Sequence, residues 1–132
     1  SAKLDSCIEL ILEARDNASE RLRIELQLLE EEKELLERHE QDTIEVEERI
    51  AQKRDEIYRT ELKALRDYYK KAAGIAEDGS LAQMQAILQG LNAEIKMRKE
   101  NGEDTWQLEQ ERAQKWHDFC SWPDMKRMIR IL

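Results

Sequence analysis

Histidine and cysteine are the residues of this sequence best suited to bind a metal or act as a nucleophile, and it holds two of each. His117 and Cys120 are three residues apart, which would put them on one face of a helix. Two ligands alone do not hold zinc. A helical di-iron site needs Glu three residues before each His, but Leu36 precedes His39 and Gln114 precedes His117 at that spacing. We therefore expect no metal and no cofactor, and we expect His117 and Cys120 to pack beside the tryptophans.

The sequence also lacks the usual signs of catalysis. A nucleophilic Cys7 or Cys120 would need a histidine base and an enclosed cleft. The many carboxylates lie on polar helical stretches, where water keeps them ionised and unfit to act as general acids. No glycine-rich phosphate loop, EF-hand loop or HExxH motif occurs, so we expect no enzymatic activity. His39 falls at a possible core position of a coiled coil, where it is either a tolerated polar residue or a pH-sensitive register device.

The composition is typical of long helices. Of 132 residues, 39% are charged and 5% are aromatic, with 4 Gly and 1 Pro. A doubly wound α/β enzyme or a barrel needs more glycine turns and more apolar strands, so the sequence predicts an all-α protein. The two cysteines are too few for a disulfide framework, which favours an intracellular protein, cytoplasmic or nuclear, with reduced thiols.

Negative charge is concentrated in one stretch of the chain. The net charge is −8, and residues 30–49 hold ten acids and three bases, or −7, against 20 acids and 19 bases elsewhere. Surfaces that bind nucleic acids need a positive stripe, so we expect no nucleic-acid partner. The acidic stretch is either a solvated helix face or a surface that attracts a basic partner.

No segment has the length and apolarity of a membrane span. The longest uncharged stretch, residues 79–93, is too short to cross a bilayer, and we expect no membrane partner. The chain ends with three bases, Lys126, Arg127 and Arg130, among methionines and isoleucines. This basic end is short for membrane binding and would suit packing on an acidic helix instead. Because the apolar run continues to Leu132, we expect the chain to be part of a longer protein.

The first half of the sequence predicts one long helix. Residues 3–71 contain no Gly and no Pro, either of which would destabilise a helix interior. Positions 22, 29, 36, 43, 50, 57 and 64 are seven residues apart, and six of the seven are apolar, which is the pattern of a left-handed coiled coil. A helix of about 70 residues would be about 105 Å long, more than the rest of the chain can cover. It therefore needs a partner helix, and a second copy, antiparallel rather than parallel, is the simplest candidate.

The second half predicts a helical hairpin. Two glycines, an Asp and a Ser between residues 74 and 80 form a helix stop followed by an N-cap. Apolar residues at 3-4-3-4 spacing then predict a helix over about 81–100, long enough to fold back along the end of the first helix. Asn101-Gly102 would end this helix, with Gly in the left-handed conformation.

Short helices follow the hairpin. Asp104 resembles the start of a capping box for a helix over about 105–120. Ser121 and Pro123 suit the start of a last helix. All three tryptophans lie within residues 106–122, and we expect them to form one packed unit that ties the final helices to the rod.

Two short stretches resemble a known family. A long helix followed by Ile87-Leu88-Gln89-Gly90 and, in a later helix, by Pro123-Asp124-Met125-Lys126 is similar to the coiled-coil region of tripartite-motif (TRIM) ubiquitin ligases. The heptads upstream do not match that family, and no function is carried across from it.

These patterns predict an all-α, elongated coiled coil made by one long N-terminal helix (1–73). A helical hairpin and short C-terminal helices (74–132) follow, and we expect them to pack back on the long helix as part of the same structural unit. The favoured function is a non-catalytic oligomerisation or scaffold module of a larger intracellular protein, a homodimer that holds protomers or partners at fixed spacing. The alternative is an adaptor whose long helix and Trp/Met-rich C-terminal helices bind a foreign helix. The residues predicted to make these contacts are the apolar positions of the seam, the second helix and the tryptophans: Leu22, Leu29, Leu36, Ile50, Ile57, Leu62, Leu65, Tyr69, Leu81, Met84, Leu88, Leu91, Ile95, Trp106, Trp116 and Trp122.

Overall fold

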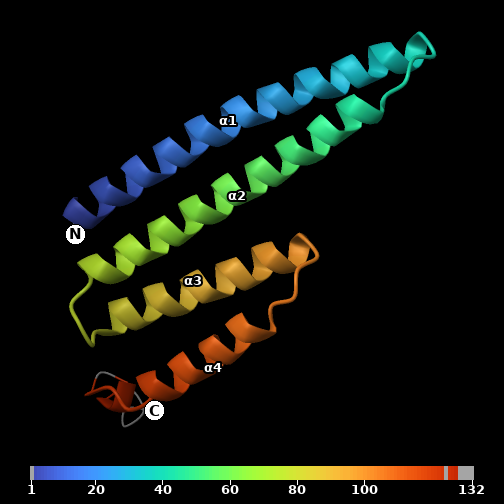
Figure 1. The fold of residues 1–132 in the computed structure, drawn as a ribbon. Coiled ribbons are helices and arrows are strands. Elements are labelled where there is room, and N and C mark those ends of the chain that lie inside the picture. The colour runs from blue at the N-terminus through green and yellow to red at the C-terminus, as the bar shows by residue number, and fades with distance from the viewer. Residues whose placement is uncertain (1, 124, 128–132) are drawn as a thin grey trace. The chain divides into compact units, whose positions relative to one another are not determined.

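Helices make up all the regular structure in the described part of the chain. The computed structural model describes residues 2–123 and 125–127, in which four α-helices of ten residues or more follow one another (Figure 1). They are α1 (Ala2–Arg38), α2 (Ile44–Ile75), α3 (Leu81–Glu100) and α4 (Trp106–Phe119). Residues 123 and 125–127 are also helical, whereas the rest of the predicted last helix, at 124 and 128–132, lies outside the described residues. The predicted all-α class is confirmed.

The predicted single helix over 1–73 is not formed, because the chain turns at residues 39–43. The last turn of α1 closes with two characteristic bonds: Gln41 N–H donates to Leu36 C=O at 2.8 Å and Glu40 N–H donates to Glu37 C=O at 3.1 Å. This is the Schellman ending of a helix, in which the residue after the C-cap takes the left-handed conformation. That residue is Glu40, with φ of 54°, in place of the usual glycine.

The start of α2 carries its own capping groups. Asp42 Oδ1 accepts a hydrogen bond from the backbone N–H of Ile44 at 3.0 Å, and Thr43 Oγ1 lies 3.3 Å from Glu47 Oε1. Acidic side chains in the first turn, Glu45 and Glu47, favour the positive end of the helix dipole. Asp and Thr followed by acids are a helix-start signal, and this signal was present in the sequence.

The chain divides into two compact units. One comprises Ile11–Ala64 and is called the hairpin unit below; the other comprises Ser1–Leu10 with Leu65–Leu132 and is called the bundle unit. The α2 helix contributes its first part to the hairpin unit and its last part to the bundle unit. The α2 helix ends at Ile75, close to the boundary predicted between residues 73 and 74, whereas the two compact units divide between Ala64 and Leu65, so the predicted boundary stays a prediction.

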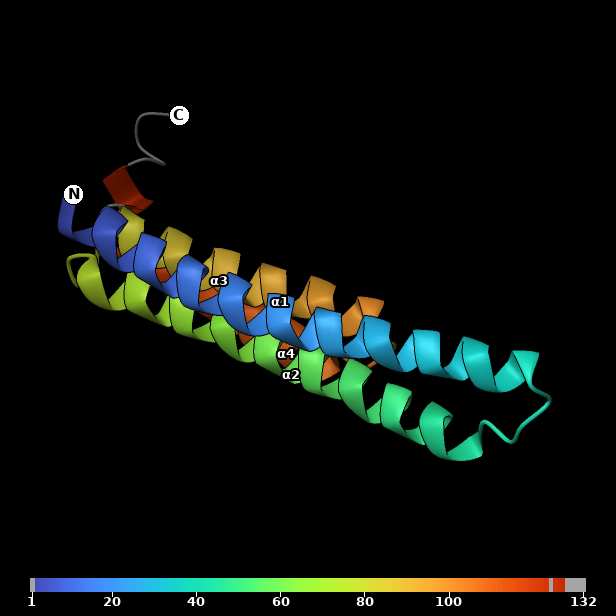
Figure 2. The same ribbon diagram turned by 90° about the horizontal axis from the view of Figure 1, so that it is seen from above.

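The hairpin unit consists of α1 from Ile11 onward and of α2 as far as Ala64, which run antiparallel and side by side in both views (Figures 1 and 2). Ion pairs between the two helices fix their register, with Arg23 of α1 paired late in α2, at Glu61, and Lys33 paired early in it, at Glu47. The pairs, in order along α1, are Arg23–Glu61, Glu25–Lys53, Glu30–Arg54 and Lys33–Glu47. The seven-residue repeat predicted from the sequence lies along this seam, with Leu22 and Ile50 buried and Leu29, Leu36 and Ile57 half-buried.

The bundle unit places α3 against the end of α2 and against α4, which runs antiparallel to α3 (Figure 1). Arg66 of α2 contacts Glu94 of α3. Between α3 and α4, Arg112 donates to Asn92 and Lys99 donates to Glu109, both at 2.9 Å. The core cluster is formed by Met84, Phe119 and Met125, with Leu81, Ile87, Leu88 and Trp122 packed around it.

The ends of α3 match the sequence signals. Ser80 is the N-cap and its hydroxyl accepts a hydrogen bond from Gln83 N–H at 3.1 Å. At the other end, Gly102 takes φ of 77° and the same Schellman bonds form, from Glu103 N–H to Arg98 C=O and from Gly102 N–H to Lys99 C=O. The Asp104 carboxylate then accepts from Trp106 N–H, which starts α4.

Gly90 sets how closely α3 approaches α2. A Cβ atom at this position would lie 2.8 Å from Tyr69 Cβ and 3.1 Å from Tyr69 Cγ. These distances are too short for carbon atoms, so any larger residue must push the two helices apart. The absence of a side chain at residue 90 is therefore a packing requirement of the bundle unit.

We predict that Gly90→Ala lowers the free energy of unfolding by about 1 to 3 kcal/mol, because the added methyl overpacks the contact with Tyr69. Gly74→Ala, on α2, is the matched control, since nothing lies within 4 Å of a Cβ there; it should leave stability unchanged or raise it by up to about 1 kcal/mol. Urea unfolding monitored by circular dichroism measures both. Equal effects at the two glycines would contradict the close approach of α3 to α2.

Candidate interaction surfaces

The α1 helix has two apolar stripes on different sides. Positions 22, 26, 29, 33 and 36 face α2 and are buried or half-buried. Ile24, Leu28 and Leu35 lie on the far side and are exposed, with 60% of Leu28 accessible compared with 2% of Leu22. Together with Glu31 these three residues have 4-3-4 spacing, the spacing of a coiled-coil seam. This set, Ile24, Leu28, Glu31 and Leu35, is called the outer stripe below.

The structure places most of the predicted contact residues inside the chain. Leu22, Ile50, Leu62, Met84 and Ile95 are buried. A second group is half-buried and consists of Leu29, Leu36, Ile57, Leu65, Tyr69, Leu81, Leu88, Leu91 and Trp122. The two helices of the hairpin unit thus supply each other with the partner that the seven-residue repeat requires. The exposed residues of the outer stripe were not among those predicted, although their 4-3-4 spacing was visible in the sequence.

Beside Leu28, a groove of about 420 Å³ runs between α1 and α2 in the hairpin unit. Its apolar lining residues are Leu28 and Leu29, and the lining is completed by Glu25, Glu32, Arg49, Gln52, Lys53 and Glu56. Lys53 Nζ donates to Glu25 at 2.7 Å and to Glu56 at 3.2 Å. The hydrogen bond from Lys53 lowers the pKa of the Glu25 carboxyl, and the bonds to Glu25 and then Glu56 raise the pKa of the Lys53 ammonium. Both shifts favour the charged forms of Glu25 and Lys53. The two residues therefore pair α1 with α2, and neither is suited to act as a general acid or base.

The second exposed apolar surface lies on α4. Trp106 is 62% accessible and Trp116 is 50% accessible. A groove of about 520 Å³ runs beside Trp116 between α3 and α4, lined by Leu88, Asn92, Glu109, Arg112, Ala113 and Trp116. Tryptophan is enriched among the residues that dominate protein–protein binding, because its large ring buries much area at little entropic cost.

The expected packed unit of three tryptophans is not formed. Trp122 stacks edge to face on Phe119, with ring centroids 4.5 Å apart, whereas Trp106 and Trp116 point away from the core and are exposed. The inner side of α4 consists instead of Leu108, Arg112, Lys115 and Phe119, at 4-3-4 spacing. Long basic side chains can cover apolar surface with their stems while their charged ends stay in water, which lets Arg112 and Lys115 take inward positions.

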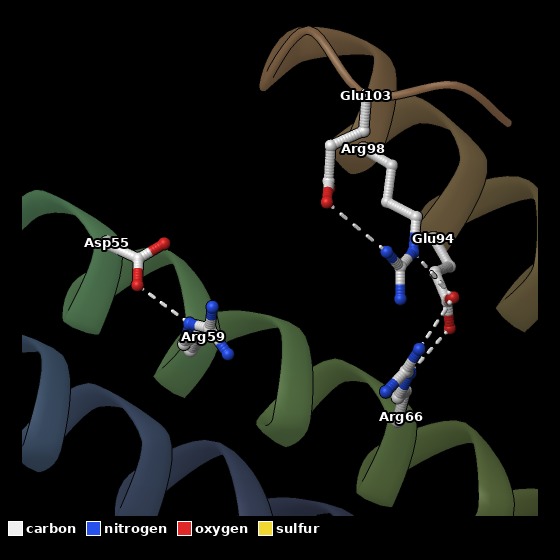
Figure 3. Close-up of polar contacts among 6 residues, drawn as sticks. All are labelled: Asp55, Arg59, Arg66, Glu94, Arg98 and Glu103. Atoms are coloured by element: carbon white, nitrogen blue, oxygen red, sulfur yellow. Dashed lines mark hydrogen bonds and ion pairs between the residues drawn. The ribbon is translucent and has the colours of Figure 1, made fainter.

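A buried carboxylate joins the helices of the bundle unit (Figure 3). Glu94 of α3 is 8% exposed and receives two hydrogen bonds from the Arg66 guanidinium of α2, at 2.8 and 3.0 Å, and one from Arg98 Nε at 2.9 Å. Arg98 also reaches Glu103, in the α3–α4 loop, at 3.5 Å. The bonds from Arg66 are the main cause of a lowered pKa at Glu94, which outweighs the opposing effect of burial.

Histidine and cysteine do not come together with further ligands in the described residues. Among these, no group of three or more His, Cys, Asp or Glu side chains could hold a metal ion. His117 is 85% exposed and does not pack among tryptophans as expected, while Cys120 is half-buried. His39 is exposed in the turn after α1, which removes the basis for a register device at a coiled-coil core. The Cys7 side chain lies outside the described part.

The helices described are also too polar or too short to cross a bilayer, and no membrane span is found among them.

Replacing a leucine by alanine should affect stability differently on the two sides of α1. We predict that Leu22→Ala costs about 2 to 5 kcal/mol of stability, because it leaves a cavity in the seam of the hairpin unit. Leu28→Ala should change stability by less than about 0.5 kcal/mol, because the side chain is mostly in water. Thermal and urea unfolding of the two variants provide the comparison. Similar losses at both positions would show that Leu28 is covered in the folded protein.

We predict that the folded protein becomes less stable in acid, because protonation of Glu94 removes its ionic hydrogen bonds. Because the folded state lowers the pKa of this carboxyl, its contribution is present above about pH 4.5 and is lost as the pH falls through the lowered value. Glu94→Gln should therefore cost about 1.5 to 3 kcal/mol near neutral pH, and the difference from the parent should shrink below about pH 4.5. Glu111→Gln, an exposed position on α4, is the charge-matched control and should have little effect. A difference for Glu94→Gln that stays constant with pH would contradict the role of the ionised carboxylate.

Comparisons with protein-family models, with curated proteins and with solved structures found no match for this chain. The candidate surfaces are therefore the outer stripe of α1 and the exposed Trp106 and Trp116 of α4.

Proposed function

We propose that the chain is a non-catalytic helical interaction module that binds helices of other proteins. The observation that carries this proposal is the exposure of Ile24, Leu28 and Leu35 on one side of α1 and of Trp106 and Trp116 on α4. Exposed large apolar residues gathered on one side of a helix are unfavourable in water and often mark a binding surface. Each of these helices already uses its other side for packing within the chain, so the exposed sides remain for a partner.

The geometry of the outer stripe suits a helix rather than a loop or a strand. Ile24, Leu28 and Leu35 follow the 4-3-4 spacing by which one helix inserts its side chains between those of another. The groove beside Leu28 is lined by two leucines and by charged residues, a mixture that suits an amphipathic helix. This function corresponds to the adaptor alternative from the sequence, without enzymatic activity or a cofactor.

A second candidate is a homodimeric scaffold, which the exposed tryptophans favour. Trp106 and Trp116 lie on one helix, and two copies of such a surface can face each other across a two-fold axis. The seam predicted to join two copies is occupied within each chain, so a dimer would have to use α4 or the outer stripe instead. Both candidates suit an intracellular protein with reduced cysteines, as the sequence predicts.

Photo-crosslinking in cells separates the two candidates. A photoreactive residue at Leu28 and, in a second variant, at Trp116 should give adducts with a foreign protein, whereas the same residue at Glu48, exposed on α2, should give none. Sedimentation of the purified chain should show a monomer. Adducts and sedimentation at twice the chain mass would support the homodimer instead, and Trp106→Ala with Trp116→Ala should then restore the monomer. A monomer that gives no adduct at either position would refute both functions.

A further inference from the structure

Glu31 interrupts the outer stripe of α1 at its centre. It occupies the position between Leu28 and Leu35 that an apolar residue would fill in a regular seam. The side chain is exposed, and it forms no ion pair or hydrogen bond with the other described residues. Of the neighbouring acids, Glu30 is bound by Arg54 at 3.3 Å and Glu34 by Arg38 at 2.7 Å. A free carboxylate in the middle of an apolar stripe is a feature that a partner can recognise.

We propose that the outer stripe binds an amphipathic helix of another protein that places a Lys or Arg opposite Glu31. This inference rests on the proposed function and specifies the chemistry of the partner. A single charged residue at a seam position fixes the register and choice of partner in coiled coils, because an apolar or like-charged neighbour leaves it unpaired when the seam closes.

Self-pairing along the outer stripe is disfavoured by the same residue. In a parallel pair, Glu31 would face Glu31 of the second copy, and the flanking Arg21 and Arg38 would face their own counterparts. In the antiparallel register that matches Ile24 with Leu35, Glu31 faces Leu28 and Arg21 faces Arg38. Each arrangement buries a charge against an apolar group or a like charge, which destabilises the pair.

The charge of the surrounding unit favours a basic partner. Of the 30 acids and 22 bases in the chain, the hairpin unit (Ile11–Ala64) holds 17 acids and 10 bases, a net charge of −7, and the remainder holds 13 acids and 12 bases, or −1. A negative potential concentrated on this unit attracts a basic helix during diffusion and repels an acidic one. Charge complementarity thus selects the same class of partner as the contact at Glu31.

Two designed helical peptides test the proposal on the full chain. They share an apolar 4-3-4 stripe and differ in one seam residue, Lys or Glu, at the position facing Glu31. Fluorescence anisotropy should show that the parent chain binds the Lys peptide about tenfold more tightly than the Glu peptide. Glu31→Lys should reverse this preference, and Glu31→Gln should remove most of it. Glu48→Lys, which makes the same charge change on α2, is the control and should keep the preference for the Lys peptide.

Self-association provides a second, independent measurement. Glu31→Leu completes an apolar seam of four residues, and this variant should sediment as a dimer under conditions where the parent is a monomer. Glu48→Leu should remain a monomer. A Glu31→Leu variant that stays monomeric would contradict the role of Glu31 in preventing self-pairing.

The outcomes also separate this inference from the proposed function. Equal affinity for the two peptides would overturn the selection by Glu31 while leaving a helix-binding surface in place. Binding of neither peptide would overturn the outer stripe as the site, and crosslinks from Trp116 would then still support an interaction module that works through α4.

Discussion

The reversal of the chain at residues 39–43 determines which sides of α1 and α2 are covered and which stay exposed. By ending α1 at Arg38 and starting α2 at Ile44, it brings the two halves of one seven-residue repeat against each other. Leu22 and Ile50 are then buried without a second molecule. The surfaces left for partners are consequently the outer sides of the helices, where the apolar residues are fewer and are interrupted by charge.

The bundle unit depends on a different pair of constraints. Gly90 allows α3 to lie against Tyr69, and Glu94, one turn further along α3, takes hydrogen bonds from Arg66 on α2. A buried carboxylate is unfavourable unless its oxygens are occupied, and here both are. The contact is therefore specific as well as close, because sliding α3 along α2 would leave the carboxylate unpaired. Arg98 extends the same network to Glu103 in the α3–α4 loop.

The ends of a helix could be predicted from the sequence when a residue type that is typical of helix ends stands at each of them. Ser80 and Gly102 correctly delimit α3, because a hydroxyl cap and a glycine with positive φ are recognisable by residue type. The same Schellman ending closes α1, but Glu40 occupies the position usually taken by glycine, so the turn could not be recognised from Gly or Pro. The caps at Asp42 and Thr43 were readable and would have placed the start of α2.

The interaction surfaces were harder to predict than the helices. The seven-residue repeat includes Leu22 and Ile50, which are buried in the structure, but periodicity does not reveal whether the partner is the same chain or another. The tryptophans were expected in a core because large aromatic residues bury much area. The core around Met84 instead uses Phe119, and the stems of Arg112 and Lys115 line the inner side of α4, which hydrophobicity alone does not indicate. The salt bridge at Glu94 joins residues far apart in the sequence and left no local pattern.

The short turn at Glu40 also gives α2 an advantage over any second chain in pairing with α1. This advantage can be expressed as an effective concentration of α2 near α1. Two helices joined by a few residues meet at an effective concentration in the millimolar range, because the linker confines each to the neighbourhood of the other. A second chain offering the same seam would have to approach that concentration to displace the internal helix. At ordinary protein levels, the repeat that resembles a dimerisation signal is therefore expected to pair α1 with α2 of the same chain.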